Sequence, residues 1–224
     1  TLARYSEVAR SMPDETMHSF PAIVEASVQL QRGNAAEAAQ LLERLEAADE
    51  NVLGAADAVG AIGLARLQTG DVDGAIEALE GPYEAATDDG PRLGLGCRLA
   101  LAYAVAHRCD DARRVLEEMN ERSGGTYSDR MIALWAESLV HVQTGSGDGR
   151  GSVDAAHAIA TATDARLEHA IAALARACVL EVLGDEDASE ARDDAERQLS
   201  SLNIAGSGWR RVFELALEGV PART

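Results

Sequence analysis

Apolar positions follow one another along the chain in a pattern that repeats at a nearly fixed interval. In each interval an apolar stretch leads to a turn, and a second apolar stretch follows the turn. Turns fall at positions 33, 70 and 107, small residues at 38, 75 and 112, and leucines at 42, 79 and 116, so each step is 37 residues. Two further turns, at Gly145 and Gly184, follow after steps of 38 and 39. A period of this length indicates a repeat architecture.

One interval predicts two antiparallel helices. The first helix covers residues 55–69, and Gly70 ends it because glycine adopts the left-handed conformation that closes helices. Asp71 then caps a second helix over residues 72–79 with its side-chain oxygen. Ala75 lets the two helices pack closely, and Leu79 fills the space between neighbouring pairs. Because one pair cannot bury its apolar stripe alone, the sequence predicts an all-α solenoid of about five stacked helix pairs.

This pattern resembles the tetratricopeptide repeat over residues 14–203. The resemblance lies in the turn glycines, in the small residues after the turns, in the small residues of the first helices and in one tyrosine: Gly33, Gly70, Gly184; Ala38, Ala75, Ala112; Ala26, Gly63, Ala100, Ala177; Tyr103. The chain departs from the family in its longer period, in Ser189 and in the register of Trp135. The resemblance implies a right-handed α-solenoid that acts as a non-enzymatic module for protein–protein interaction.

The two ends of the sequence predict elements outside this array. Residues 1–13 are expected to form the closing helix of a preceding repeat. Residues 204–224 are expected to form a capping helix and tail, in which Trp209, Phe213 and Leu217 share one face at i, i+4 and i+8. A terminal amphipathic helix of this kind covers the open end of a solenoid.

The chain is also similar to the C-terminal repeat regions of large bacterial signalling regulators. In these proteins such an array follows a nucleotide-binding ATPase and sometimes a cyclase or a DNA-binding domain. The similarity rests on the Ala- and Arg-rich units, the segment Leu183-Gly184-Asp185 and the last helix with Gly208-Trp209. It implies a scaffold or sensor part of a larger protein.

Composition narrows the functional classes. The net charge is −18, and all 20 basic residues are arginine. The absence of lysine excludes P-loop, Schiff-base and kinase-type lysine chemistry. The acidic charge argues against binding nucleic acid through its phosphates. No apolar run approaches the ~18 residues of a membrane span, and Cys97, Cys109 and Cys178 fit reduced thiols, so we expect a cytoplasmic protein. The Ala-, Arg- and Gly-rich composition without lysine is typical of a high-GC bacterial genome.

No motif predicts catalysis, a metal or a cofactor. The five histidines, at positions 18, 107, 141, 157 and 169, show no paired metal spacing. The glycine-rich segment 144–151 lacks the order of a phosphate loop and is expected to be a surface turn. Paired carboxylates are common in so acidic a chain and carry no information.

The surface with most functional content is the concave face, which the first helices line in the tetratricopeptide family. The partner-binding residues that the resemblance implies are Leu64, Leu67, Gln68, Arg98, Leu101, Val105, Trp135 and Leu139, with Phe20, Ile23, Leu30, Cys97 and Ile132 at equivalent positions. Because they are mostly apolar, the groove accepts an amphipathic helix or apolar peptide, or the superhelix is wound so tightly that they are buried. A third interpretation is a small-molecule sensor, with a ligand held by these apolar residues and one arginine. The partner is therefore expected to be a protein or peptide, with a second copy of the chain as one option.

Overall fold

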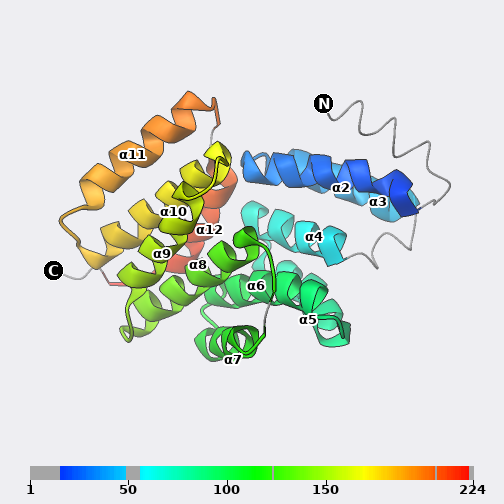
Figure 1. The fold of residues 1–224 in the computed structure, drawn as a ribbon, viewed down its shortest axis with the longest axis horizontal. Coiled ribbons are helices and arrows are strands. Elements are labelled where there is room, and N and C mark those ends of the chain that lie inside the picture. The colour runs from blue at the N-terminus through cyan, green and yellow to red at the C-terminus, as the bar shows by residue number, and fades with distance from the viewer. Residues whose placement is uncertain (1–15, 49–55, 123, 205, 222–224) are drawn as a thin grey trace.

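The computed structural model describes residues 16–48, 56–122, 124–204 and 206–221, and in these ranges it contains helices and no strands (Figure 1). Ten helices form five consecutive pairs, and an eleventh follows them. The pairs are α2 (Thr16–Gln31) with α3 (Ala35–Ala48), α4 (Ala56–Thr69) with α5 (Val72–Ala85), α6 (Asp89–Val105) with α7 (Cys109–Asn120), α8 (Tyr127–Thr144) with α9 (Gly149–Thr161), and α10 (Arg166–Leu183) with α11 (Ala188–Ser201); the last helix is α12 (Ser207–Leu217). The predicted all-α solenoid is confirmed. The predicted closing helix of a preceding repeat at residues 1–13 lies outside the described residues.

The turn inside each pair adopts the left-handed conformation that the sequence predicts. The residues at the five turn positions have positive φ: Gly33 (81°), Gly70 (89°), His107 (57°), Gly145 (67°) and Gly184 (65°). At Gly70 the amide donates to Leu67 O at 3.0 Å and the next amide, of Asp71, donates to Arg66 O at 2.9 Å. These are the paired bonds of a Schellman motif, which satisfy the last carbonyls of the first helix. The Asp71 side chain in turn accepts from the Gly74 amide and caps α5.

The second helix of this unit is longer than predicted. We expected residues 72–79, but α5 continues to Ala85 with Pro82 inside it. The helix persists because Tyr83 is buried against the core at 3% exposure, so tertiary packing outweighs the local effect of the proline.

Small residues set the distance between the two helices of a pair. Ala38, Ala75 and Ala112, the small residues after the first three turns, are each 0% exposed. Gly63 of α4 lies directly against Leu79 of α5: a Cβ built on Gly63 would lie 2.6 Å from the Leu79 Cγ. The close approach of α4 and α5 therefore depends on the missing side chain at position 63.

First and second helices differ in how much of their circumference is covered. In α4, every residue from Ala58 to Ala65 is buried, and in α6 every residue from Leu99 to Val105. Second helices bury a single stripe instead, such as Ala112, Val115 and Met119 in α7. The first helices thus form an inner layer that must be covered on two sides.

The C-terminal helix provides the inner cover. The predicted helix forms, but it does not stand at the open end of the array: α12 packs against the first helices α4, α6, α8 and α10 (Figure 1). Trp209, Val212, Phe213 and Ala216, which lie at i, i+3, i+4 and i+7, are at most 3% exposed. The helix lies there because the middle turns of α4 and α6 are apolar on every side and need a cover on the inner side as well. In addition, α2 of the first pair contacts α10 of the last, so the array curves back toward its own beginning.

Neighbouring pairs are also joined by a polar cluster at Glu118 of α7. Its carboxylate accepts from Arg92 Nε of α6 at 2.6 Å, from Tyr83 Oη of α5 at 2.5 Å and from Arg122 Nη2 at 3.1 Å. Hydrogen bonds from Arg92 and Tyr83 lower the pKa of Glu118 from 4.5 to about 2. Burial, together with the bond to Glu118, raises the pKa of Tyr83 to about 12.

We predict that Gly63→Ala destabilises the fold and that Gly81→Ala does not. The new methyl group at position 63 overlaps Leu79, and overpacking of this kind costs about 1–3 kcal/mol, more than the ~1 kcal/mol that alanine gains in helix propensity. No atom lies within 4 Å of a Cβ at Gly81, so the control gains stability. Urea unfolding of the two variants measures the difference; equal midpoints would contradict the packing argument.

We predict that acid unfolding of the protein depends on Glu118. Since the folded state lowers this pKa from 4.5 to about 2, the stabilisation is fully present above pH 4.5 and is lost as the pH falls toward 2. Because the side chain is 31% exposed, the contribution is on the order of 1 kcal/mol. Glu118→Gln should flatten the pH dependence of the unfolding free energy in this window, whereas Glu117→Gln, at an exposed position, should leave it unchanged.

Candidate functional site

An aromatic cluster forms where α12 meets the concave face. Trp135 of α8 contacts Trp209 of α12 edge to face, with ring centroids 5.4 Å apart and an interplanar angle of 67°. Phe213 of α12 lies at 5.8 Å from Trp135 and is perpendicular to it. The chain has only two tryptophans and two phenylalanines. Both tryptophans and one phenylalanine therefore gather at one contact, where aromatic pairs add about 0.5–1.5 kcal/mol beyond area burial.

One glutamine fixes α12 to the ends of two first helices. The Gln143 Nε2 group of α8 donates to Ala104 O of α6 at 2.8 Å and to Ala216 O of α12 at 2.6 Å. Its Oε1 accepts from the Cys109 Sγ at 3.1 Å. Both amide protons of Gln143 are thereby used, and the C-terminal end of α12 is held at a defined place on the concave face.

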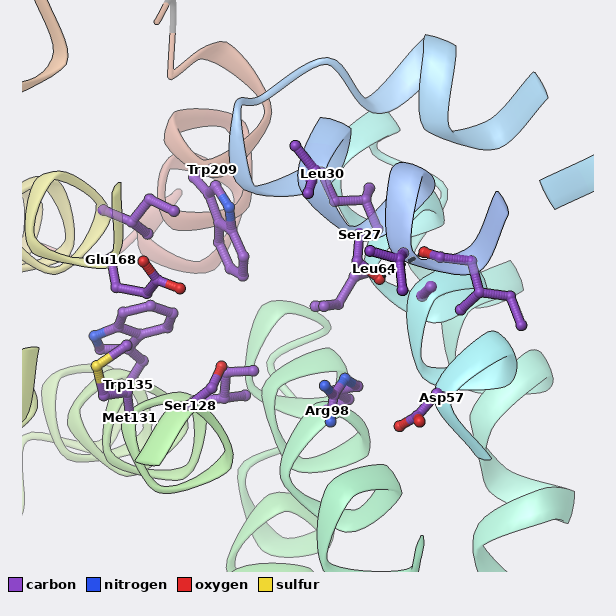
Figure 2. A pocket seen from close by; sticks show the side chains of 16 residues that line it. Ser27, Leu30, Asp57, Leu64, Arg98, Ser128, Met131, Trp135, Glu168 and Trp209 are labelled. Atoms are coloured by element: carbon purple, nitrogen blue, oxygen red, sulfur yellow. Dashed lines mark hydrogen bonds between the residues drawn. The ribbon is translucent and has the colours of Figure 1, made fainter. Parts of the chain in front are cut away.

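A cavity of about 240 Å³ remains between α12 and the ring of first helices. Figure 2 shows Trp209, Glu168 and Trp135 on one side of it, Leu30, Ser27 and Leu64 on the other, and Arg98 and Ser128 between them. The walls come from α2, α4, α6, α8, α10 and α12, so the cavity exists only because the array curves and α12 closes it. Most of the lining is apolar: Ile23, Val24, Val28, Leu30, Ala61, Leu64, Met131, Ile132, Trp135, Ile171 and Trp209.

The positive charge at the cavity is compensated inside the protein. Arg98 Nη1 donates to Gly94 O at 2.6 Å and to the carboxylate of Asp129 at 2.9 Å. Asp129 is itself held at the start of α8, where its other oxygen accepts from the Thr126 amide and hydroxyl. Asp57 and Glu168 add two carboxylates to the lining. The cavity therefore carries no excess of positive charge.

The structure divides the eight predicted groove residues into two sets. Leu64, Arg98 and Trp135 line the cavity. Leu67, Leu101, Val105 and Leu139 are 0–3% exposed, and Gln68 is buried with Nε2 donating to Leu30 O. These five positions are therefore buried in the folded chain, in which α12 packs against the first helices. Of the equivalent positions, Ile23, Leu30 and Ile132 line the cavity, Cys97 is buried, and the Phe20 side chain lies outside the described residues.

Several residues that line the cavity were not predicted from the sequence. Trp209 was assigned to an end cap, and Asp57, Met131, Glu168 and Ile171 were not named. The one available signal was the pair of tryptophans in a chain with 4% aromatic residues. The rarity of tryptophan marks Trp135 and Trp209 as candidate functional or core residues. It does not show that the two side chains are in contact, because that contact depends on the curvature of the array.

The thiols and metal-binding side chains show no reactive arrangement in the described parts of the chain. Burial raises the pKa of Cys97 to about 12 and that of Cys178 to about 11, which keeps both thiols protonated and weakly nucleophilic at neutral pH. The described residues contain no cluster of three or more His, Cys, Asp or Glu that could hold a metal ion. None of their helices is both long enough and apolar enough to cross a membrane.

A comparison with protein families matches residues 23–91 to a model described as tetratricopeptide repeat. The matched segment runs from α2 through α5 to the start of α6. This match supports the similarity of the chain to tetratricopeptide repeats. The comparisons with curated proteins and with solved structures found no match.

We predict that Gln143→Leu loosens α12 and lowers stability. The change removes both donors to Ala104 O and Ala216 O, and buried groups left unpaired cost about 1–3 kcal/mol. Gln198→Leu, which removes a bond within α11 to Asp194, is the matched control and should change stability by less than about 0.5 kcal/mol. Urea unfolding compares the two. Equal losses in both variants would show that Gln143 does not anchor α12.

Proposed function

We propose that the chain is a non-enzymatic protein–protein interaction module whose concave face binds an amphipathic helix. Tetratricopeptide repeats generally mediate protein–protein interactions, and residues 23–91 match that family. The partner-binding positions in this proposal are the eight groove residues already described, with Trp135 as the central anchor. A regulatory or scaffold role within a larger bacterial signalling protein, in the cytoplasm, is part of the same proposal.

The observation that carries the proposal is the position of α12 on the concave face, in contact with the first helices. This helix presents Trp209, Val212, Phe213 and Ala216 to the first helices and buries them almost completely. Its outer face carries the exposed Arg211 and Glu214. An amphipathic helix with anchors at i, i+3, i+4 and i+7 is the ligand that helix-in-groove recognition uses. The concave face is thus complementary to such a helix, and in this structure the helix comes from the same chain.

The partner helix that fits this groove shares the features of α12. It carries a large aromatic residue four positions before a second one, as Trp209 and Phe213 do, and a polar outer face. The net charge of −18 favours a partner with basic residues, because opposite charges increase the rate of encounter. The partner replaces α12 on the groove, so the position of α12 regulates access.

A second candidate function is small-molecule sensing inside the superhelix. The cavity of about 240 Å³ favours it, since apolar first-helix residues and Arg98 line that cavity. Its volume lies slightly below the ~300 Å³ at the lower end of ligand pockets, which restricts the occupant to a small molecule.

Competition between α12 and a free copy of its sequence tests the interaction function. A fluorescein-labelled peptide of residues 206–218 is titrated into the full chain and followed by fluorescence anisotropy. The wild-type chain should bind it weakly, because the attached helix competes at an effective concentration of ~mM or more. A Phe213→Ala chain should bind the peptide at least about tenfold more tightly, since losing a buried phenylalanine weakens its own helix by a part of ~3–5 kcal/mol.

Two controls make this result specific. Glu214→Ala, on the exposed face of α12, should leave peptide binding at the wild-type level. A peptide carrying Phe213→Ala, and a Phe213→Ala chain that also carries Trp135→Ala, should both lose binding while circular dichroism confirms the helical fold. If the Phe213→Ala chain remains folded and does not take up the peptide, the concave face is not a helix-binding groove.

A further inference from the structure

We propose that the cavity beside α12 binds a small, uncharged, largely apolar molecule with a hydrogen-bond acceptor, and that the indole N–H of Trp209 recognises this acceptor. The inference rests on the sensing candidate and names the chemistry of its ligand. It follows from the cavity lining, from an unpaired buried donor and from the distribution of charge.

The unpaired donor is the strongest of these observations. Trp209 is 3% exposed, and its Nε1 has no hydrogen-bond acceptor among the residues that the structure describes. An indole nitrogen donates only, and a buried donor without an acceptor destabilises the folded protein. A phenylalanine side chain has no polar atom and would not incur this cost. An acceptor atom within hydrogen-bond distance of Nε1 removes the penalty.

The orientation of the two tryptophans distinguishes their nitrogens. Figure 2 shows the ring nitrogen of Trp209 on the edge that faces Leu30 and Ser27 across the cavity. The nitrogen of Trp135, which also lacks an acceptor among the described residues, lies on the edge away from the cavity. Arg98 also lines the cavity, but its Nε lies against Gly60 of α4. The indole N–H of Trp209 is therefore the donor that an occupant with an acceptor, such as a ketone, ester or amide carbonyl, would complement.

The charges at the cavity disfavour an anionic form of such a molecule. An anion would meet the carboxylates of Asp57 and Glu168 and a protein of net charge −18. The guanidinium of Arg98 offers little compensation, since Asp129 already pairs with it at 2.9 Å. A cation would suit the carboxylates but has no acceptor for the indole N–H. An uncharged carbonyl on an apolar body satisfies the donor and matches the apolar walls.

The experiment uses the two indole N–H signals of the full chain, since the protein has only two tryptophans. Four probes share one ring size: cyclohexanone, cyclohexane, cyclohexanecarboxylate and cyclohexylammonium. In ¹H–¹⁵N correlation spectra, cyclohexanone should shift the Trp209 indole proton downfield in a saturable manner, as a new hydrogen bond requires. Cyclohexane and cyclohexylammonium, which carry no acceptor, should bind more weakly, and cyclohexanecarboxylate should bind most weakly.

Matched variants assign the recognition to one nitrogen. Trp209→Phe removes the donor and should weaken cyclohexanone binding about five- to tenfold, the effect of one neutral hydrogen bond. Trp135→Phe removes the same atoms from the other ring of the lining, so it loses apolar contact but no donor that faces the cavity, and it should weaken cyclohexanone binding less than Trp209→Phe does. Ligand-observed NMR gives both affinities, and the indole shift in the wild-type chain remains decisive if a variant does not fold.

The possible outcomes distinguish the proposed ligand chemistry from the sensing function on which it rests. Tighter binding of cyclohexanecarboxylate or cyclohexylammonium than of cyclohexanone would overturn the proposed ligand chemistry and leave a sensing pocket. Binding of cyclohexanone without a shift of the Trp209 signal would overturn the role of Trp209. Absence of binding by all four probes would overturn both the inference and the sensing function.

Discussion

The middle turns of the first helices α4 and α6 are buried on every side, and the molecule must cover them both inside and outside. The second helices cover the outer side with one buried stripe each, as α7 does with Ala112, Val115 and Met119. The inner side has no such cover from the repeats themselves. Curvature of the array and the position of α12 follow from this one requirement, because uncovered apolar surface costs about 25 cal/mol per Å².

The local features of the fold were predictable because each depends on neighbouring residues. Gly70 and Gly184 adopt the left-handed turns that their sequence positions indicate, and Ala75 is buried where the period places it. The longer extent of α5 was not predictable in this way, since the burial of Tyr83 against the core carries the helix past Pro82.

The candidate site was only partly predictable, for a different physical reason. Of the groove positions predicted on the first helices, Leu64, Arg98 and Trp135 line the cavity. The opposite wall depends on contacts between units far apart in sequence, such as α2 with α10 and α12 with α4. The curvature that makes them is a sum of small angles over five units, and no motif of one unit encodes it. Trp209 therefore looked like the core of an end cap.

The order of the helices along the chain has a consequence for biosynthesis. Domains generally fold from the N-terminus as they are made, at about 5–20 residues per second, and α12 follows all five pairs in the chain. The pairs are therefore translated before the helix that shields their inner side. Until α12 docks, the apolar residues of α4, α6, α8 and α10 that it covers in the folded chain stay exposed to water.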